Sequence, residues 1–242
     1  MTARMPWQQH LTMAFLLATG CNAAQPASQT SPLKRWEGDA VSVDTPQRKF
    51  RWSVERCGPR LRSEWRDASG ALVAWDEVTQ SGVAANRYDV MRVKSTESYS
   101  ASFQNREIII DSAKNGRSLG RERIGTHGDA VVAGPMLIAL VQEQLSRIRA
   151  GEDLVRSYLI PEKPMVLRLL ARRLQTSAGG SISVLIQAAS PLLRPFVPTT
   201  VLEFDGRDQL IRSSGHILPL QGAANLTTIK QPHQQPEQIC EF

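Results

Sequence analysis

Apolar and polar residues alternate with a period of two along much of the chain from Lys49 onward. In residues 50–55, Phe50, Trp52 and Val54 share one face, and the side chains between them are polar. Because successive side chains of a strand point to opposite faces, this pattern predicts a strand with one buried face. The same pattern recurs, separated by turn residues, at 60–66, 72–78, 88–93, 99–103, 107–110 and 117–124.

The short turns between these segments favour an antiparallel meander. Asn115-Gly116 stands between the last two segments, and this dipeptide supplies the positive φ angles that a two-residue hairpin requires. Parallel strands need long crossover connections, which are usually helical, and residues 49–124 show no helical pattern. We therefore expect neighbouring antiparallel strands with one face on the core and one face in water.

A long helix is predicted over residues 135–150. Pro135 suits the first position of a helix, and Gly151 marks its end. Between them, apolar residues recur at spacings of three and four, namely Met136, Leu137, Leu140, Val141, Leu145 and Ile148. The apolar stripe needs another surface to cover it.

Strand patterns return after the helix, at 154–160, 165–174, 181–187, 201–204 and 209–213. Together with the first half, this gives about ten strands and one long amphipathic helix. A helix laid on a curved sheet buries the apolar faces of both. The predicted fold is α+β and mostly β: a curved antiparallel sheet, or half-barrel, with the helix packed on it.

Residues 1–20 have the pattern of an export signal. Arg4 is followed by the short apolar run 11–18 and by small residues up to Cys21. The run is far shorter than the roughly 20 residues of a membrane-spanning helix, so we expect the segment to be removed after export. Residues 21–48 contain few large apolar side chains and are expected to form a flexible linker, within which a first short strand begins near Trp36. We expect residues 49–220 to form a single domain and residues 221–242 a polar tail.

Two fates are open for Cys21. Residues 17–21 resemble the lipobox of bacterial lipoproteins, although Ala18 stands where that family usually has Leu. The resemblance implies acylation of Cys21, and Asn22 after it implies the outer membrane. Acyl chains contribute about 0.8 kcal/mol per buried CH₂, enough for three chains to hold the protein on a membrane. The alternative is ordinary secretory cleavage near Ala23 and Ala24, which would remove Cys21.

The chain contains three cysteines, so that an even pair remains once Cys21 is acylated or lost. A disulfide between Cys57 and Cys240 would close a loop of about 180 residues and stabilise the fold by about 4 to 5 kcal/mol. The alternative is that Cys240 is free in the polar tail.

The formal net charge is +6, and the basic residues are spread along the chain rather than clustered. This distribution argues against a nucleic-acid partner. The sequence has no P-loop, no Gly-x-Gly-x-x-Gly, no Cys-x-x-Cys and no calcium loop, so no cofactor is expected. His127, His216 and His233 each lack a second ligand at metal-binding spacing, and no metal site is expected.

Residues 116–120 match the Gly-x-Ser-x-Gly pattern of serine hydrolases. Ser118 would be the nucleophile, and Asp205 and His216 follow it in the order of that fold. The chemistry requires the serine between a buried strand and a helix, where its hydroxyl meets the histidine and amide groups form an oxyanion hole. Because residues 117–124 have a strand pattern, a serine esterase is the alternative function rather than the first one.

Aromatic side chains gather in the first half of the chain. If their strands are neighbours, these residues line one concave wall. They then either form the core beneath the helix or surround an apolar cavity that the helix does not fill, suited to an acyl chain. The set consists of Phe50, Trp52, Trp65, Trp75, Tyr88, Tyr99 and Phe103.

The order of elements, together with residues 17–21, resembles the half-open barrels of bacterial envelope lipoproteins. It is similar to the carriers and receptor that move lipoproteins to the outer membrane, and to uncharacterised periplasmic families of that shape. The resemblance implies an exported, non-enzymatic protein of the periplasm, anchored to the outer membrane, that binds a hydrophobic ligand or an envelope partner. The other functions left open are the serine esterase and a structural or assembly lipoprotein without a small ligand.

Overall fold

The computed structural model describes residues 34–43, 45–104, 106–126, 128–177, 179–216 and 223–230, all within the unit Ser31–Phe242. Most of these residues lie in strands. The strands are β1 (Lys34–Ser42), β2 (Lys49–Cys57), β3 (Arg60–Asp67), β4 (Leu72–Ser81), β5 (Ala84–Arg92), β6 (Glu97–Gln104), β7 (Glu107–Lys114), β8 (Arg117–Gly125), β9 (Val131–Val132), β10 (Leu154–Ile160), β11 (Met165–Thr176), β12 (Ile182–Ala188), β13 (Thr200–Phe204), β14 (Leu210–His216) and β15 (Ala223–Lys230). The helical elements are α1 (Met136–Glu143), α2 (Leu145–Arg149) and the 3₁₀ turn η1 (Pro191–Leu193).

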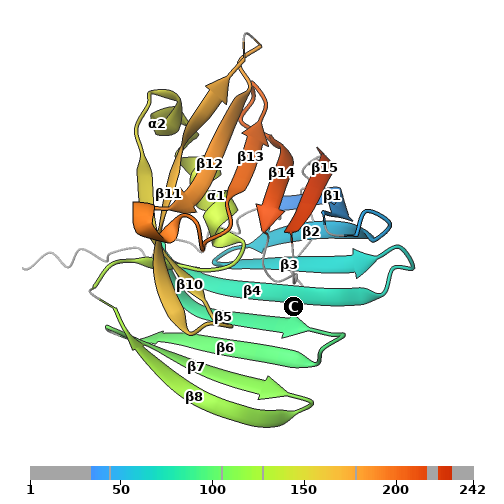
Figure 1. Ribbon diagram of the computed structural model, residues 1–242, viewed down its shortest axis with the longest axis vertical. Helices are drawn as coiled ribbons and strands as arrows, with labels where there is room; N and C mark the ends of the chain where they lie inside the picture. Colours follow the sequence, from blue (N-terminus) through green and yellow to red (C-terminus); the bar gives the residue numbers. More distant parts are fainter. Residues whose placement is uncertain are drawn as a thin grey trace, which may run out of the picture. The chain divides into compact units, whose positions relative to one another are not determined.

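The strands form one continuous sheet, in the order β8-β7-β6-β5-β4-β3-β2-β1-β15-β14-β13-β12-β11-β10-β9. Strands β1 to β8 form one antiparallel meander and β10 to β15 a second, and the two run in different directions in Figure 1. The antiparallel pairing of β1 with β15 joins them. The two-residue β9 pairs with β10 in parallel. The first and last described strands are therefore neighbours, and their pairing makes the sheet continuous.

The period-two prediction is confirmed for β2 and β3, whereas β8, over the predicted segment 117–124, has no buried residue. On β2, Phe50, Trp52 and Val54 are buried while the residues between them are partly or fully exposed. The predicted hairpin turn is also present between β7 and β8, with φ angles of 53° at Asn115 and 72° at Gly116. Both central residues thus have the left-handed conformation that this turn requires.

The predicted fold is wrong in the number of strands and in the helix. The described part of the chain has fifteen strands instead of about ten. Instead of one long helix over 135–150, α1 has 8 residues and α2 has 5. The break lies at Gln144, which leaves helical geometry with φ −104° and ψ 11°. The break allows α2 to pack on β11. Neither helix is long and apolar enough to cross a membrane, and the same holds for every helix of the described residues.

Two strands lie outside the predicted domain limits, residues 49–220. Strand β1 occupies residues that we expected to be flexible linker, and β15 lies in the expected polar tail. The signal segment and Cys21 lie outside the described residues. Cys57 is disulfide-bonded, but Cys240 also lies outside the described residues, so the Cys57–Cys240 pairing stays a prediction.

One hydrophobic core connects the two meanders and both helices. It contains the buried faces of β2 to β5 together with those of β10 to β14. From α1, the core receives Met136, Leu140 and Val141, and from α2 it receives Leu145 and Ile148. The helices therefore pack against the interior face of the sheet and determine which part of that interior stays unfilled.

Candidate functional site

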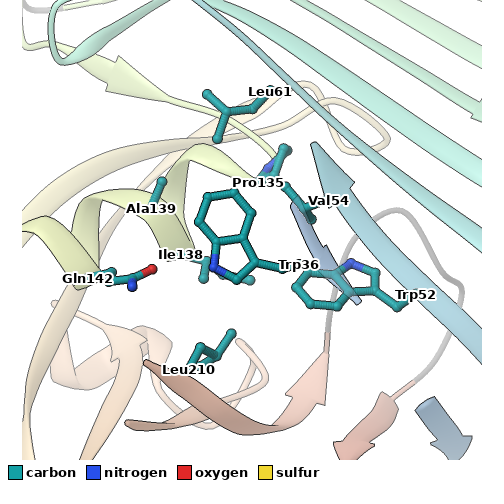
Figure 2. A pocket seen from close by; sticks show the side chains of 9 residues that line it. All are labelled: Trp36, Trp52, Val54, Leu61, Pro135, Ile138, Ala139, Gln142 and Leu210. Carbon is teal, nitrogen blue, oxygen red and sulfur yellow. The ribbon is translucent and has the colours of Figure 1, made fainter. Parts of the chain in front are cut away.

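The first of two hollows lies between α1 and the first strands of the sheet. We call it the Trp36 hollow, and its volume is about 290 Å³ with its open mouth included. Figure 2 shows the Trp36 indole at its centre, with side chains of α1 on one side and Val54 and Trp52 on the other. The wall is almost entirely apolar. Its residues are Trp36, Trp52, Val54, Leu61, Pro135, Ile138, Ala139, Gln142 and Leu210.

The second hollow involves both meanders and the first turn of α1. We call it the Ser213 hollow, and its volume is about 470 Å³ with its open mouth included. It shares Trp52, Pro135 and Ile138 with the Trp36 hollow, so the two are neighbours. Its wall is apolar with several hydroxyl groups. The residues are Trp52, Ser63, Gly134, Pro135, Leu137, Ile138, Tyr158, Ile186, Thr200, Leu202 and Ser213.

Gly134 sets the position at which α1 begins. Its φ is +49°, and a Cβ at this residue would lie 2.6 Å from Asp76 Oδ2 and 2.5 Å from Cε2 of Tyr88. No other residue fits such a close approach without displacing its neighbours. The glycine therefore brings the start of the helix against the interior of β4 and β5, beside the Ser213 hollow.

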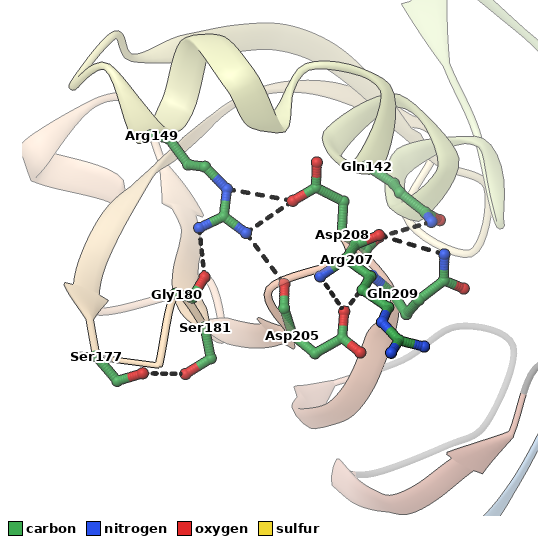
Figure 3. A network of polar contacts seen from close by, with 9 residues as sticks. All are labelled: Gln142, Arg149, Ser177, Gly180, Ser181, Asp205, Arg207, Asp208 and Gln209. Carbon is green, nitrogen blue, oxygen red and sulfur yellow. Dashed lines mark hydrogen bonds and ion pairs between the residues drawn. The ribbon is translucent and has the colours of Figure 1, made fainter.

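A polar network fixes the other end of the helical segment (Figure 3). Arg149 of α2 donates hydrogen bonds to the Asp208 carboxylate at 2.7 Å and to the Gly180 carbonyl at 2.6 Å. Gln142 of α1 donates to the Asp208 carbonyl at 2.9 Å. Asp208 lies in the turn between β13 and β14. The network thus holds both helices to the ends of the second meander and keeps α1 in place beside the hollows.

A buried polar cluster lies directly behind the Ser213 hollow. Asp76 is completely buried and directly opposite Ser63 in the β3–β4 pair. The Ser63 hydroxyl donates a hydrogen bond to Asp76 Oδ1, and the Tyr88 hydroxyl donates to Oδ2 at 3.0 Å. Since Ser63 lines the hollow, it separates the Asp76 carboxyl from this space.

Burial raises the pKa of Asp76 from its ordinary value of 3.8 to about 7. The hydrogen bonds from Ser63 and Tyr88 act in the opposite direction, whereas the charge of Glu162 raises this pKa further. Burial likewise raises the pKa of Tyr88 and of Tyr158. Near neutral pH, the neutral and the ionised forms of Asp76 are both populated.

The structure brings part of the predicted aromatic set together. Trp65 lies between Phe50 and Trp52, with ring centroids 6.5 Å and 6.2 Å away. Tyr88 is fully buried beside them in the same core cluster. Of the predicted set, only Trp52 lines the two hollows, and the other three named here fill the core.

The remaining aromatic residues lie elsewhere. Trp75 is paired with Glu64 on the opposite face of the sheet, and the Arg62 guanidinium lies 4.8 Å from its ring centroid. Tyr99 is partly buried with the Arg92 guanidinium 5.7 Å from its ring, and Phe103 packs partly buried against the core. Trp75 is thus not part of an interior wall.

The structure does not assemble the predicted triad. Ser118 is exposed on β8, opposite Ala113, and not at a strand-to-helix elbow. Asp205 accepts hydrogen bonds from the N–H groups of Arg207 and Gln209, which shape the turn after β13. The end of β14 holds His216, and eight strands separate β14 from β8 in the sheet. Among the described residues, no group of three or more His, Cys, Asp or Glu is arranged to hold a metal ion.

The prediction missed the residues that α1 and β1 contribute. Trp36 fell in the expected linker, and Ile138 and Ala139 lie beside the apolar stripe rather than in it. A signal for the helix residues was present, because residues 135–141 are apolar on every side of the helix. A helix that is apolar all round is buried on more than one face. Here its second face borders the hollows.

Comparison with known proteins finds no matching family model and no matching curated protein. Among solved structures, the chain is similar to the crystal structure of a beta-barrel-like protein of domain of unknown function DUF1849 from Brucella abortus. The TM-score is 0.46 at 6% sequence identity, and the match covers 84% of this chain and 99% of that chain.

Proposed function

We propose that this protein is a non-enzymatic binding protein that holds a hydrophobic ligand in the Trp36 hollow and the neighbouring Ser213 hollow. The observation that carries the proposal is that both hollows border α1 and share Trp52, Pro135 and Ile138. Together they form one largely apolar recess beside α1, in which a ligand would contact side chains of both meanders. The indole rings of Trp36 and Trp52 supply a large flat contact surface for an alkyl chain.

The cellular setting belongs to the same proposal. Export through residues 1–20 and acylation of Cys21 would place the protein in the periplasm, on the outer membrane. Hydrophobic ligands are abundant at such a surface. Native mass spectrometry of the protein purified from its own envelope should then detect a bound lipid, and protein that is consistently empty would contradict ligand binding.

A direct test uses the neutral fluorescent probe N-phenyl-1-naphthylamine. We expect saturable binding to the wild-type protein and at least a tenfold loss of affinity in Ala139→Trp, because the indole would fill the Trp36 hollow. The matched control is Ala150→Trp, since Ala150 is exposed at the end of α2. Equal affinities in the two variants would contradict this site. Absence of binding in the wild type would favour a structural or assembly role without a small ligand.

A further inference from the structure

One polar side chain interrupts an aliphatic row on the inner face of the second meander. Ser213 of β14 is paired with Leu202 of β13 and with Leu226 of β15, and Leu202 is paired with Val184 of β12. Side chains that are directly opposite in neighbouring strands point to the same face. All four residues have an exposed fraction of 0%. Ser213 therefore occupies a position at which its neighbours are Val or Leu.

The Ser213 hydroxyl has no hydrogen-bond partner among the described residues. A buried hydroxyl without a partner costs about 1 to 3 kcal/mol, a cost that Ala at this position would avoid. Ser213 and its neighbour Leu202 both line the Ser213 hollow. The hydroxyl is therefore a buried, unpartnered group of a residue in the wall of this hollow.

The other hydroxyl groups of this wall are engaged. Ser63 donates its hydrogen bond to Asp76, and the Tyr158 hydroxyl is hydrogen-bonded to the backbone of Gly134. Thr200 likewise already has an interaction partner. Ser213 is thus the hydroxyl of the described wall that has no hydrogen-bond partner in the protein.

The charge of the wall restricts the ligand further. None of the residues that line the Ser213 hollow is charged. The Asp76 carboxyl accepts the hydrogen bond of Ser63, which lines the hollow, and would repel an anion there when it is ionised. A carboxylate or phosphate head group would therefore lose its hydration water without meeting a positively charged side chain in this wall.

We infer that the ligand is a neutral amphiphile, with an aliphatic chain beside Trp52 and α1 and an uncharged hydroxyl head group hydrogen-bonded to Ser213 Oγ. This inference depends on the proposed function and specifies its ligand class. Fatty alcohols and monoacylglycerols have this chemistry, whereas free fatty acids at neutral pH do not.

The test is displacement of N-phenyl-1-naphthylamine from the full protein at about pH 8 by 1-dodecanol, dodecanoate and dodecane, three ligands that differ in the head group. We expect dodecanol to displace the probe at a concentration at least tenfold lower than dodecanoate. In Ser213→Ala, dodecanol should weaken about fivefold and dodecane should not change. The matched control is Ser146→Ala, on the exposed side of α2, which should leave all three values unchanged.

The outcomes separate the two proposals. If the probe does not bind the wild-type protein, the proposed function fails. If the probe binds but dodecanoate competes as well as dodecanol, or Ser213→Ala behaves as the wild type, the inference fails and the proposed function stands. The thermal midpoint of Ser213→Ala adds a check, since loss of an unpartnered hydroxyl should not lower it. A clear decrease would assign this hydroxyl to folding instead.

Discussion

Asp76→Asn should change how the stability of this protein depends on pH. The Asp76 carboxyl is completely buried, and burial raises its pKa from 3.8 to about 7. A carboxyl that holds its proton more tightly in the folded state than in the unfolded state favours folding at low pH. Its contribution is fully present below about pH 4 and is lost as pH rises towards about 7.

The size of the effect follows from the two pKa values. One pKa unit corresponds to about 1.4 kcal/mol, so a difference between 3.8 and about 7 amounts to about 4 kcal/mol. The wild-type protein should therefore lose about 4 kcal/mol of unfolding free energy across this interval. Asn cannot ionise, and the variant loses this dependence. Its amide nitrogen replaces one of the acceptors of Ser63 and Tyr88, at a cost that does not vary with pH.

The assay is urea unfolding of both proteins, followed by tryptophan fluorescence, between about pH 5 and 8. The difference in unfolding free energy should shift in favour of Asp76→Asn by roughly 1 kcal/mol for each pH unit between about 5 and 7. The control is Asp111→Asn. Asp111 is exposed, and the hydrogen bond from Arg121 lowers its pKa, so its titration lies below the range of the assay.

Parallel stability curves for the wild type and Asp76→Asn would refute the argument. They would mean that the carboxyl has the same pKa in the folded and unfolded states, and hence that water reaches it. A variant that is less stable than the wild type by a constant amount would show that the hydrogen bonds of Ser63 and Tyr88 matter but the buried charge does not.

Four further changes test other parts of the structure. Arg149→Leu removes the helix-anchoring network and should lower the free energy of unfolding by about 2 kcal/mol in urea. Gly215→Ala should lower it by about 3 kcal/mol, because φ is +118° and a Cβ would collide with a neighbouring carbonyl. Cys57→Ser removes a disulfide and should cost about 2 to 5 kcal/mol without reductant, and peptide mapping of the wild type should recover a Cys57–Cys240 peptide. Metabolic palmitate should label the wild type but not Cys21→Ala, and equal labelling would contradict acylation at this residue.

Local patterns predicted the strands well where the alternation is clear. The strand around Trp52 and the hairpin at Asn115-Gly116 depend on neighbouring residues alone, and both are present. The pairing of β1 with β15 depends on residues almost two hundred positions apart, which no local period reveals. The sequence therefore predicts only a short strand near Trp36 within the linker, and it predicts no strand in the tail.

The errors in the helix and the aromatic wall have local causes. The spacing of apolar residues continues unchanged from α1 into α2, so it does not predict the break at Gln144. The break accompanies the packing of α2 on β11, a contact between segments that are distant in the sequence. Trp75 follows residues 71–74, which are all apolar and interrupt the alternation of the predicted strand 72–78. Its face is set by pairing with Glu64 and by the register shift between Trp65 and Arg66.

The polar residues of the interior bear on the position of the proposed binding site. A sheet interior selected for stability alone would place apolar side chains opposite one another, as most of this core does. Six buried residues of the described chain are polar or charged, and three of them, Ser63, Asp76 and Ser213, lie around the start of α1 at Gly134. Polar side chains in an otherwise apolar core are most often found at functional sites, where they lower stability but serve binding or catalysis. The same corner of the interior holds the Ser213 hollow, whose wall includes Ser63 and Ser213.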